Sequence, residues 1–443
     1  MYAINFKDGR SVLFDPIKVK LYNPDGSKID VSAAVRVDPD CSKVRNQLNH
    51  HVHKNFRSKY PTNLRIVLGH ACNFRCKYCS QAHTKKSDIS EEKIQSFMDS
   101  IKQTIGFDNL KIVQFWGGEP LLYWDEIVKL MDALREVHPG VGFSLVTNGS
   151  LITDEIADHI LNDHAFGFIL SHDGPGQALR GIDPLREGSK TREILLRMAR
   201  HNLPKQNRRY VNEGRNFAVN PVITSEVKSL INLVKWYDEA FEGMQIPIAE
   251  SIPVIPIQED TAQYALHHAD LAAYTRMLYN DLLTLGIHRF DNYHLTLELF
   301  VQKLNMDDFE VNPAKALCFT TDPNMLTVDI DGNVLPCQTF GVDDILQTGE
   351  PANCGTLEDL RLSDPTKNDN RLHMPTVHGY QSRGNSCTRC PVVSFCMGGC
   401  PYLIGKAHEV DCNVKYHHFL GLLLTYMTLL FGDRVSLIYN KGN

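Results

Sequence analysis

Cysteine is the residue type in this chain with the clearest capacity for chemistry, because many of the cysteines lie in two short segments. The 443 residues include 12 Cys, and three of them, Cys72, Cys76 and Cys79, lie within eight positions. Five more lie between Cys387 and Cys412. Thiols stay reduced in the cytosol, so disulfides are not favoured, and closely spaced thiolates are typical of metal or iron–sulfur ligands.

The rest of the composition indicates a cytoplasmic globular protein. The first ten residues contain no apolar signal segment. The longest apolar run, residues 419–431, has thirteen residues, too few to span a bilayer, so we expect a buried terminal helix and no membrane partner. Lys plus Arg number 46 and Asp plus Glu 52, a formal charge of −6 that favours no nucleic-acid partner.

The first cysteine segment supplies one ligand fewer than a structural zinc site takes. Cys72-x3-Cys76-x2-Cys79 offers three thiolates, whereas zinc in structural sites takes four ligands. A four-iron cubane held by three thiolates keeps one iron open to a non-protein ligand. The spacing therefore favours the cubane, and a zinc site is the alternative.

A repeated pattern of strand, loop and helix begins at Leu64 and must position these cysteines. We predict strands over residues 64–68, 111–116, 143–147, 166–171, 217–223 and 246–257. Helices follow them, the first opened by Ser90 and the others over residues 126–137, 154–162, 191–201, 225–241, 262–285 and 292–304. Six such units in series predict an α/β fold, a partial (β/α)6 barrel of the TIM type with parallel strands.

Three regions follow from this pattern. Residues 1–60 form a small β-rich N-terminal extension, with hairpin signals at Asp8-Gly9 and Asp25-Gly26. Residues 61–305 form the barrel, and residues 306–443, rich in Cys, Gly and Pro, form a C-terminal domain that ends in the apolar helix.

Short motifs follow the predicted strands and are expected at one rim, because function in such barrels lies at the carboxyl ends of the strands. They are, in chain order, Cys72, the run Gly117-Gly118-Glu119-Pro120, Asn148-Gly149 and the run Ser171-His172-Asp173-Gly174. The glycine, Asn-Gly and Asp-Gly pairs also fit plain turns, since these residues are common turn formers.

Taken in this order, the motifs resemble the radical S-adenosylmethionine (SAM) family. Its signature C-x3-C-x2-C corresponds to the first three cysteines, with Tyr78 at the aromatic position before the third. Gly117-Gly118-Glu119-Pro120 matches the family's GGEP motif. The resemblance implies a 4Fe-4S cluster that binds SAM at its open iron, with Glu119 as the anion that takes the SAM amino group. It also implies SAM-binding roles for Ser171 and Asp173. Asn148 is a further candidate for the SAM site, with a plain turn as the alternative.

The second group of cysteines resembles the SPASM extension of radical SAM enzymes, which implies two auxiliary 4Fe-4S clusters. The outer cluster would take Cys387, Cys390, Cys396 and Cys412. The inner cluster would take Cys318, Cys337 and Cys400, and it needs a fourth ligand or an open iron. Cys354 is the candidate for that ligand, with a buried structural thiol or a hydrogen-donating thiol as alternatives. A zinc ribbon is the alternative for Cys387, Cys390, Cys396 and Cys400. Cys41 has no partner pattern.

The resemblance implies an oxidoreductase that cleaves SAM reductively to a 5′-deoxyadenosyl radical. The radical would take a hydrogen atom from a peptide or protein substrate and so install a crosslink, a thioether or an epimerised residue. Three 4Fe-4S clusters, SAM and a low-potential electron donor such as flavodoxin or ferredoxin are implied. Many peptide-modifying relatives begin with a winged-helix domain, which the β-rich residues 1–60 do not predict.

Several alternatives stay open. Anaerobic sulfatase maturases carry an aspartate base directly after the second inner-cluster cysteine, where this chain has Gln338, which accepts no proton at neutral pH. The sequence therefore favours another maturase, with Asp343, Asp344 or His172 as candidate bases, although His172 also fits a plain loop. A small-molecule substrate and a sulfatase maturase-like activity are alternatives. A non-enzymatic iron–sulfur electron carrier would not need Gly117–Pro120.

Overall fold

The computed structural model describes most of the chain. The described residues are 1–31, 57–81, 84–163, 165–202, 217–249, 252–255, 257, 263–266, 271–311, 322–367, 369–376, 383 and 385–440. Cys41 and Cys318 lie outside them, as do parts of the predicted strand over 246–257 and of the predicted helix over 262–285.

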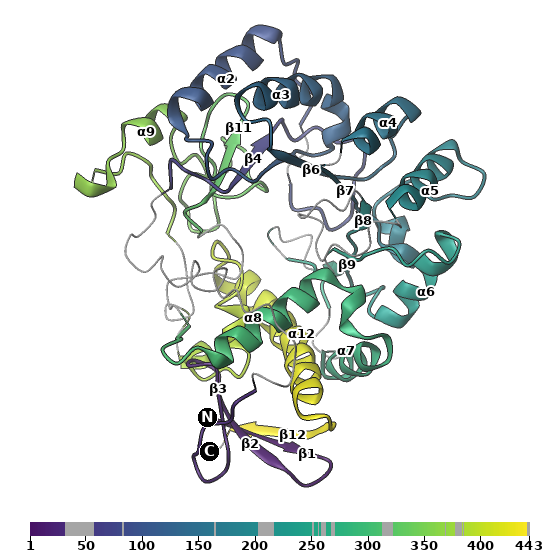
Figure 1. Cartoon of the computed structure of the whole chain (residues 1–443), viewed down its shortest axis with the longest axis vertical. Helices are drawn as coiled ribbons and strands as arrows, with labels where there is room; N and C mark the ends of the chain where they lie inside the picture. Colours follow the sequence, from purple (N-terminus) through teal and green to yellow (C-terminus); the bar gives the residue numbers. More distant parts are fainter. Residues whose placement is uncertain are drawn as a thin grey trace.

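A six-stranded parallel sheet forms the centre of the molecule (Figure 1). Its order is β11-β4-β5-β6-β7-β8, with β4 Asn63–Val67, β5 Ile112–Trp116, β6 Gly142–Thr147, β7 Phe166–Leu170, β8 Phe217–Val219 and β11 Met325–Asp329. Neighbouring strands are in register, with Leu64 opposite Val113 and Val113 opposite Phe143. The predicted α/β fold with a partial TIM-type barrel is confirmed.

The two edges of this sheet differ from the simple six-unit pattern. On one side β11, more than 250 residues further along the chain, pairs with β4 in parallel. On the other side Ile248 forms an isolated parallel bridge with Val219. In the described part of this region two short strands follow, β9 Val222–Ile223 and β10 Ile252–Pro253, which pair with each other. The strand predicted over 246–257 is therefore not a full member of the sheet in the described residues.

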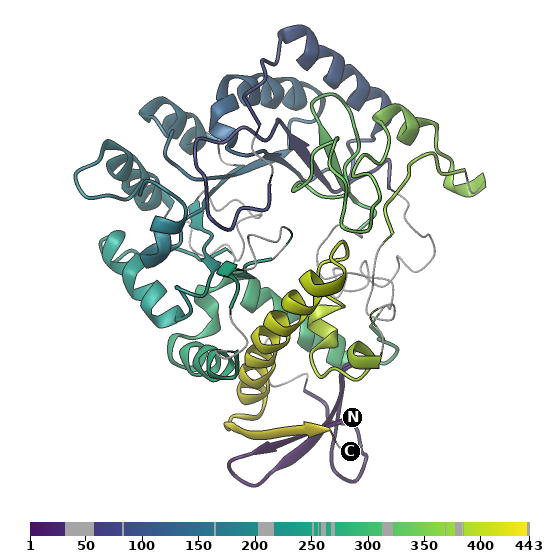
Figure 2. The same cartoon turned by 180° about the vertical axis from the view of Figure 1, so that it is seen from behind.

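Amphipathic helices cover the outer side of the sheet, as both views show (Figures 1 and 2). They are α2 Glu91–Thr104, α3 Trp124–Val137, α4 Asp154–Asn162, α5 Lys190–Asn202 and α6 Leu230–Ala240. In α2 the Ser90 hydroxyl accepts a hydrogen bond from the backbone N of Lys93, as expected for an N-cap. The same helix buries Ile94, Phe97, Met98 and Ile101 against the strands. This periodicity explains why sequence patterns located these helices.

The remaining helices include two short 3-10 helices within the barrel, η2 Pro120–Tyr123 after β5 and η3 Gly174–Leu179 after β7, and elements that follow α6 in the chain. The latter are the helices α7 Leu271–Leu285, α8 Asp291–Asn305, α9 Leu357–Leu362, α10 Asn385–Thr388, α11 Val393–Cys396 and α12 Gly405–Phe431, and the 3-10 helices η8 Ile287–Arg289 and η10 Pro365–Lys367. α12 packs along α7, where a Cβ on Gly421 would lie 2.9 Å from Leu278 Cδ2. Within the described part of the chain, no helix combines the length and apolarity that crossing a bilayer requires.

A separate antiparallel sheet joins the two ends of the chain. Its order is β12-β1-β2-β3, with β1 Tyr2–Phe6, β2 Ser11–Asp15, β3 Lys20–Tyr22 and β12 Val435–Asn440. Asp8-Gly9 forms the β1–β2 turn, and Gly9 has φ +90°, a conformation that favours glycine. The N-terminal β-rich region is thus completed by the last strand of the chain, and both termini lie beside this small sheet in Figure 1.

Candidate active site

Two glycines allow the loop after β5 to lie directly against the cysteine loop after β4. Gly118 N donates to Gly69 O at 3.0 Å, and Glu119 N donates to Ala71 O at 2.8 Å. A Cβ on Gly117 would lie 2.5 Å from Gly69 O, and one on Gly118 would lie 2.4 Å from Ala71 O. Both contacts are with backbone atoms, which cannot give way like a flexible side chain. The glycines therefore serve the packing of the cysteine loop.

Glu119 connects the ends of β5 and β6 through a buried carboxylate that is 1% exposed. Its Oε1 accepts from Leu121 N at 3.0 Å and from Thr147 Oγ1 at 2.5 Å, and its Oε2 accepts from Asn148 N at 2.8 Å. A carboxylate has about four acceptor positions, so one on Oε2 stays open. Burial raises the pKa of Glu119, and no cation among the described residues forms an ion pair with it. The position fits a ligand ammonium group.

Asn148 ties the end of β6 to the cysteine loop. Its Nδ2 donates to Asn73 Oδ1 at 2.9 Å, and its Oδ1 accepts from Ser150 Oγ at 2.6 Å. Asn73 Nδ2 in turn donates to Ser150 Oγ at 2.8 Å. The Ser171 backbone N donates to Thr147 O at 2.7 Å, which extends the pairing of β6 and β7 to their ends. Asn148 and Ser171 are thus brought to the rim as predicted.

Tyr78, Asp173 and Arg180 form a buried network between the cysteine loop and the end of β7. The Tyr78 hydroxyl donates to Asp173 Oδ2, and Arg180 Nη2 lies 2.9 Å from Asp173 Oδ1. The guanidinium also lies 5.5 Å from the centre of the Tyr78 ring. Arg180 is only 9% exposed, and burial opposes its charge, but Asp173 raises its pKa. The sequence analysis did not identify Arg180 as a site residue. The one indication of such a residue was that a buried carboxylate needs a cation within reach.

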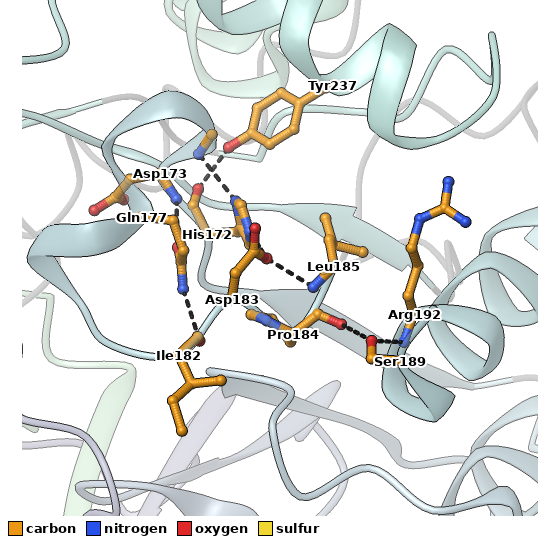
Figure 3. A network of polar contacts seen from close by, with 11 residues as sticks. His172, Asp173, Gln177, Ile182, Asp183, Pro184, Leu185, Ser189, Arg192 and Tyr237 are labelled. Atoms are coloured by element: carbon orange, nitrogen blue, oxygen red, sulfur yellow. Dashed lines mark hydrogen bonds and ion pairs between the residues drawn. The ribbon is translucent and has the colours of Figure 1, made fainter. Parts of the chain in front are cut away.

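His172 is held in the network of Figure 3 and is not available as a base. Its Nδ1 accepts from Gly174 N at 2.9 Å, so the ring proton lies on Nε2, which donates to Asp183 Oδ1 at 3.0 Å. The ring is fully buried and stacks on Trp236 with centroids 4.8 Å apart. Tyr237 donates its hydroxyl to His172 O at 2.5 Å. Burial lowers the pKa of His172 despite the nearby carboxylate. These contacts fit a residue that fastens the end of β7 to α6.

The first three cysteines lie together in the loop after β4. Cys72 Sγ accepts from Phe74 N at 3.4 Å. Burial raises the pKa of Cys72, and raises that of Cys76 to about 12, with the neighbouring thiols adding to the effect. Among the described residues, no three Cys, His, Asp or Glu side chains converge as they would on one ion. A cubane takes each thiolate on a different iron, and the positive charge of its core stabilises thiolates, so these half-buried thiols fit a cluster.

The C-terminal cysteines form two groups. Burial raises the pKa of Cys387, Cys390, Cys396 and Cys412, and neighbouring thiols contribute: Cys387 and Cys412 act on Cys390, while Cys390 and Cys412 act on Cys396. These four thiols are therefore within electrostatic reach of one another. Cys337 and Cys400 instead pack against a second apolar cluster, made up of Phe340, Leu346, Ala352 and Tyr402.

Gln338 links the turn after Cys337 to the barrel. Its Oε1 accepts from Arg65 Nη1 at 2.6 Å, and its backbone O accepts from Gln81 Nε2 at 3.1 Å. Arg65 lies inside the barrel, where its Nε donates to Gln114 Oε1 at 2.9 Å. Asp343 and Asp344, two of the alternative bases, differ in their surroundings. Asp344 Oδ2 accepts from Gly341 N at 2.7 Å, whereas Asp343 is exposed.

A cavity of about 140 Å³ lies between the first cysteine loop and the C-terminal cysteines. Its lining includes Ser80, Phe340, Asp344, Cys400 and Tyr402. Ser80 directly follows Cys79, so the cavity adjoins both cysteine groups.

Cys354 has contacts that differ from those of the other C-terminal cysteines. It is fully buried, belongs to the main core, and its Sγ lies 3.6 Å from Ala352 O. Burial raises the pKa of this thiol to about 12. Of the alternatives drawn from the sequence, these contacts favour a buried structural thiol.

We expect Cys354→Ala to keep the iron content of the wild-type protein and to cost about 1 kcal/mol of stability, because it removes one buried atom of methylene size. Iron analysis after anaerobic reconstitution and a thermal melt check this. A drop of several irons per chain would instead identify Cys354 as a cluster ligand.

Comparison with known proteins defines the class to which this fold and site belong. Residues 66–204 match the model of the Radical SAM superfamily. The chain therefore carries a radical SAM domain over these residues. This family implies SAM and a 4Fe-4S cluster.

Individual relatives extend the likeness beyond that domain. Radical SAM cyclopropyl synthase TigE from Paramaledivibacter caminithermalis is 23% identical over 382 residues, 80% of this chain and 70% of TigE. A GTP 3′,8-cyclase from Microcystis aeruginosa is 32% identical over 101 residues, 21% of this chain and 29% of the cyclase. The structure of anSMEcpe with bound AdoMet and Cp18Cys peptide has a TM-score of 0.55 at 18% identity, covering 84% of this chain and 99% of that chain. The chain shares the fold of anSMEcpe.

Proposed function

We propose that this protein is a radical SAM enzyme with a SPASM-type C-terminal region that modifies a peptide. The observation that carries the proposal is the contact of the Cys72–Cys79 loop with Glu119, Asn148 and Asp173 at the carboxyl ends of β5, β6 and β7. When bound and reduced, the cluster supplies the electron that cleaves SAM to methionine and a 5′-deoxyadenosyl radical, which takes a hydrogen atom from the substrate.

Different residues of the rim hold the cluster and SAM. Cys72, Cys76 and Cys79 hold the cluster, and Glu119 receives the SAM ammonium at its open acceptor position. Asn148, Ser171 and Asp173 complete the SAM site, with Tyr78 and the Gly117-Gly118-Glu119-Pro120 loop keeping the cysteine loop in place. Burial of Glu119, Asn148, Asp173 and Tyr78 helps to exclude water from a radical reaction.

The C-terminal cysteines would hold two auxiliary 4Fe-4S clusters. Cys387, Cys390, Cys396 and Cys412 are the proposed ligands of the outer cluster, and Cys318, Cys337 and Cys400 those of the inner one. The cavity between Ser80 and Cys400 is the proposed place of the reacting part of the substrate, because it adjoins both cysteine groups. A flavodoxin or ferredoxin is the proposed electron donor.

A peptide is the proposed substrate, a choice supported by anSMEcpe, which has this fold and was solved with a peptide bound. The proposal leaves the type of modification unassigned. The name of TigE, a cyclopropyl synthase, illustrates one kind of radical product. Gln338 in place of an aspartate supports a maturase other than a sulfatase maturase.

A small-molecule substrate is the second candidate, and the similarity to GTP 3′,8-cyclases favours it. The two candidates separate in a mass-spectrometric assay of the reconstituted enzyme with peptides from its genomic neighbourhood and with GTP. A peptide that changes mass only when SAM is present supports the first candidate. Turnover of GTP alone supports the second.

The proposed function is tested by anaerobic reconstitution, followed by iron analysis and by an assay for 5′-deoxyadenosine with a low-potential reductant. Three cubanes give about twelve irons per chain. We also expect SAM to change the electron paramagnetic resonance spectrum of the reduced cluster. About four irons would confine the proposal to the first cysteine group, and a spectrum insensitive to SAM would contradict it.

Glu119→Gln is expected to weaken SAM binding about 10- to 100-fold, since a hydrogen bond to a charged group contributes about 1.5–3 kcal/mol. Equilibrium dialysis of SAM against the reconstituted variant measures this. Glu91→Gln, an exposed change on α2, is the control and keeps wild-type affinity. Wild-type affinity in Glu119→Gln as well would show that another group takes the ammonium.

A further inference from the structure

The turn between Cys396 and Cys400 has an unusual backbone. Met397, Gly398 and Gly399 have φ values of 48°, 93° and 80°, so three successive residues lie in the left-handed region. Glycine adopts this region freely, whereas methionine does so at a cost. A turn of this kind persists only when its surroundings hold it in place.

A buried ion pair on α12 holds this turn. Asp411 Oδ2 accepts from Cys400 N at 3.3 Å and from Lys415 Nζ at 2.7 Å. A Cβ on Gly399 would lie 2.6 Å from Asp411 Oδ2 and 3.7 Å from Lys415 Nζ, so both charged groups lie directly against the turn. Asp411 is 1% exposed and Lys415 is 6% exposed.

The charge of Lys415 lies against the turn that joins the two C-terminal cysteine groups. Its Nζ donates to Asp411 Oδ2, and Asp411 Oδ2 also accepts from the backbone N of Cys400. Cys396 belongs to the proposed outer cluster and Cys400 to the proposed inner one. The ammonium therefore lies beside the turn that links a proposed ligand of one cluster to a proposed ligand of the other, with little solvent to screen it. A second cation, Arg383, contacts the turn through Cys400 O at 3.0 Å.

We propose that the Asp411–Lys415 pair positions the Cys396–Cys400 turn and sets the reduction potentials of the auxiliary clusters. This inference rests on the proposed function. A cubane with four thiolates carries a net negative charge, and taking up one electron from the donor makes it more negative. The Lys415 ammonium favours the reduced state and raises the potential, while the Asp411 carboxylate favours the oxidised state and lowers it.

Two nearly isosteric variants test the proposal with opposite signs. We expect Lys415→Met to shift the auxiliary-cluster potential to lower values and Asp411→Asn to shift it to higher values, in redox titrations followed by electron paramagnetic resonance. Lys406→Met is the matched control, since Lys406 lies exposed on the same helix, and it keeps the wild-type potential. Potentials that stay at the wild-type value in both test variants, or that shift in the same direction, overturn the proposal.

The wild-type iron content separates this test from that of the proposed function. Wild-type protein with about four irons contradicts the auxiliary clusters themselves. Wild-type protein with about twelve irons whose variants show no opposite shifts contradicts only the role of the ion pair. If Lys415→Met loses auxiliary iron, Asp411→Asn decides the question, and a potential that does not rise overturns the proposal.

Discussion

Asp173→Ala is expected to lose SAM cleavage and about 3–5 kcal/mol of stability, the usual cost of breaking a buried ion pair by removing one partner. The Arg180 guanidinium would be left buried without its carboxylate, 2.9 Å from the vacated position. Tyr78 would lose its hydroxyl partner at the same time. Because Tyr78 lies between Cys76 and Cys79, the cysteine loop would lose its fastening to the end of β7. Chemical denaturation and a 5′-deoxyadenosine assay measure the two effects.

A variant that lacks both charges isolates the cause of this loss. Asp173→Asn with Arg180→Met removes both charges, so we expect it to be more stable than Asp173→Ala, because no uncompensated charge stays buried. Equal stability of the two proteins would show that the ion pair is not the source of the loss.

Gly118→Ala is expected to reduce SAM cleavage and iron content together and to cost about 1–3 kcal/mol or more, as over-packing of a tight contact does. The added methyl group would lie 2.4 Å from Ala71 O and 2.7 Å from His70 O. The cysteine loop would have to move away from the end of β5, which changes the spacing of its thiols from Glu119.

The matched control is Gly140→Ala, where a Cβ meets nothing within 4 Å. Iron analysis, a thermal melt and the cleavage assay apply to both variants. A Gly118→Ala protein that keeps wild-type iron and activity would contradict the packing role of the motif.

The parts of the fold that follow local patterns were predictable from the sequence. β4, β5, β6 and β7 fall within about one residue of their predicted bounds, because buried apolar runs bounded by turn residues define them. The pairing of β11 with β4 and of β12 with β1 was not predicted, since strands separated by hundreds of residues share no local signal.

The same distinction applies to the site. Cysteine spacing and the Gly117-Gly118-Glu119-Pro120 motif are local, and they indicated which loops meet. The reason for the two glycines emerged only in three dimensions, where the atoms they approach belong to the neighbouring loop. Arg180 and the Asp411–Lys415 pair were missed for the same reason, because burial, which gives these charges their importance, is not visible in the sequence.

The central claim is that three thiolates on the loop after β4 hold a cluster that cleaves SAM. Its most direct test is the yield of 5′-deoxyadenosine from anaerobically reconstituted protein in which Cys72, Cys76 and Cys79 are all replaced by Ser, given a low-potential reductant. We predict no product above the background of reductant alone, while the wild-type protein forms it under the same conditions. Formation of 5′-deoxyadenosine by the triple variant at the wild-type rate would contradict the account.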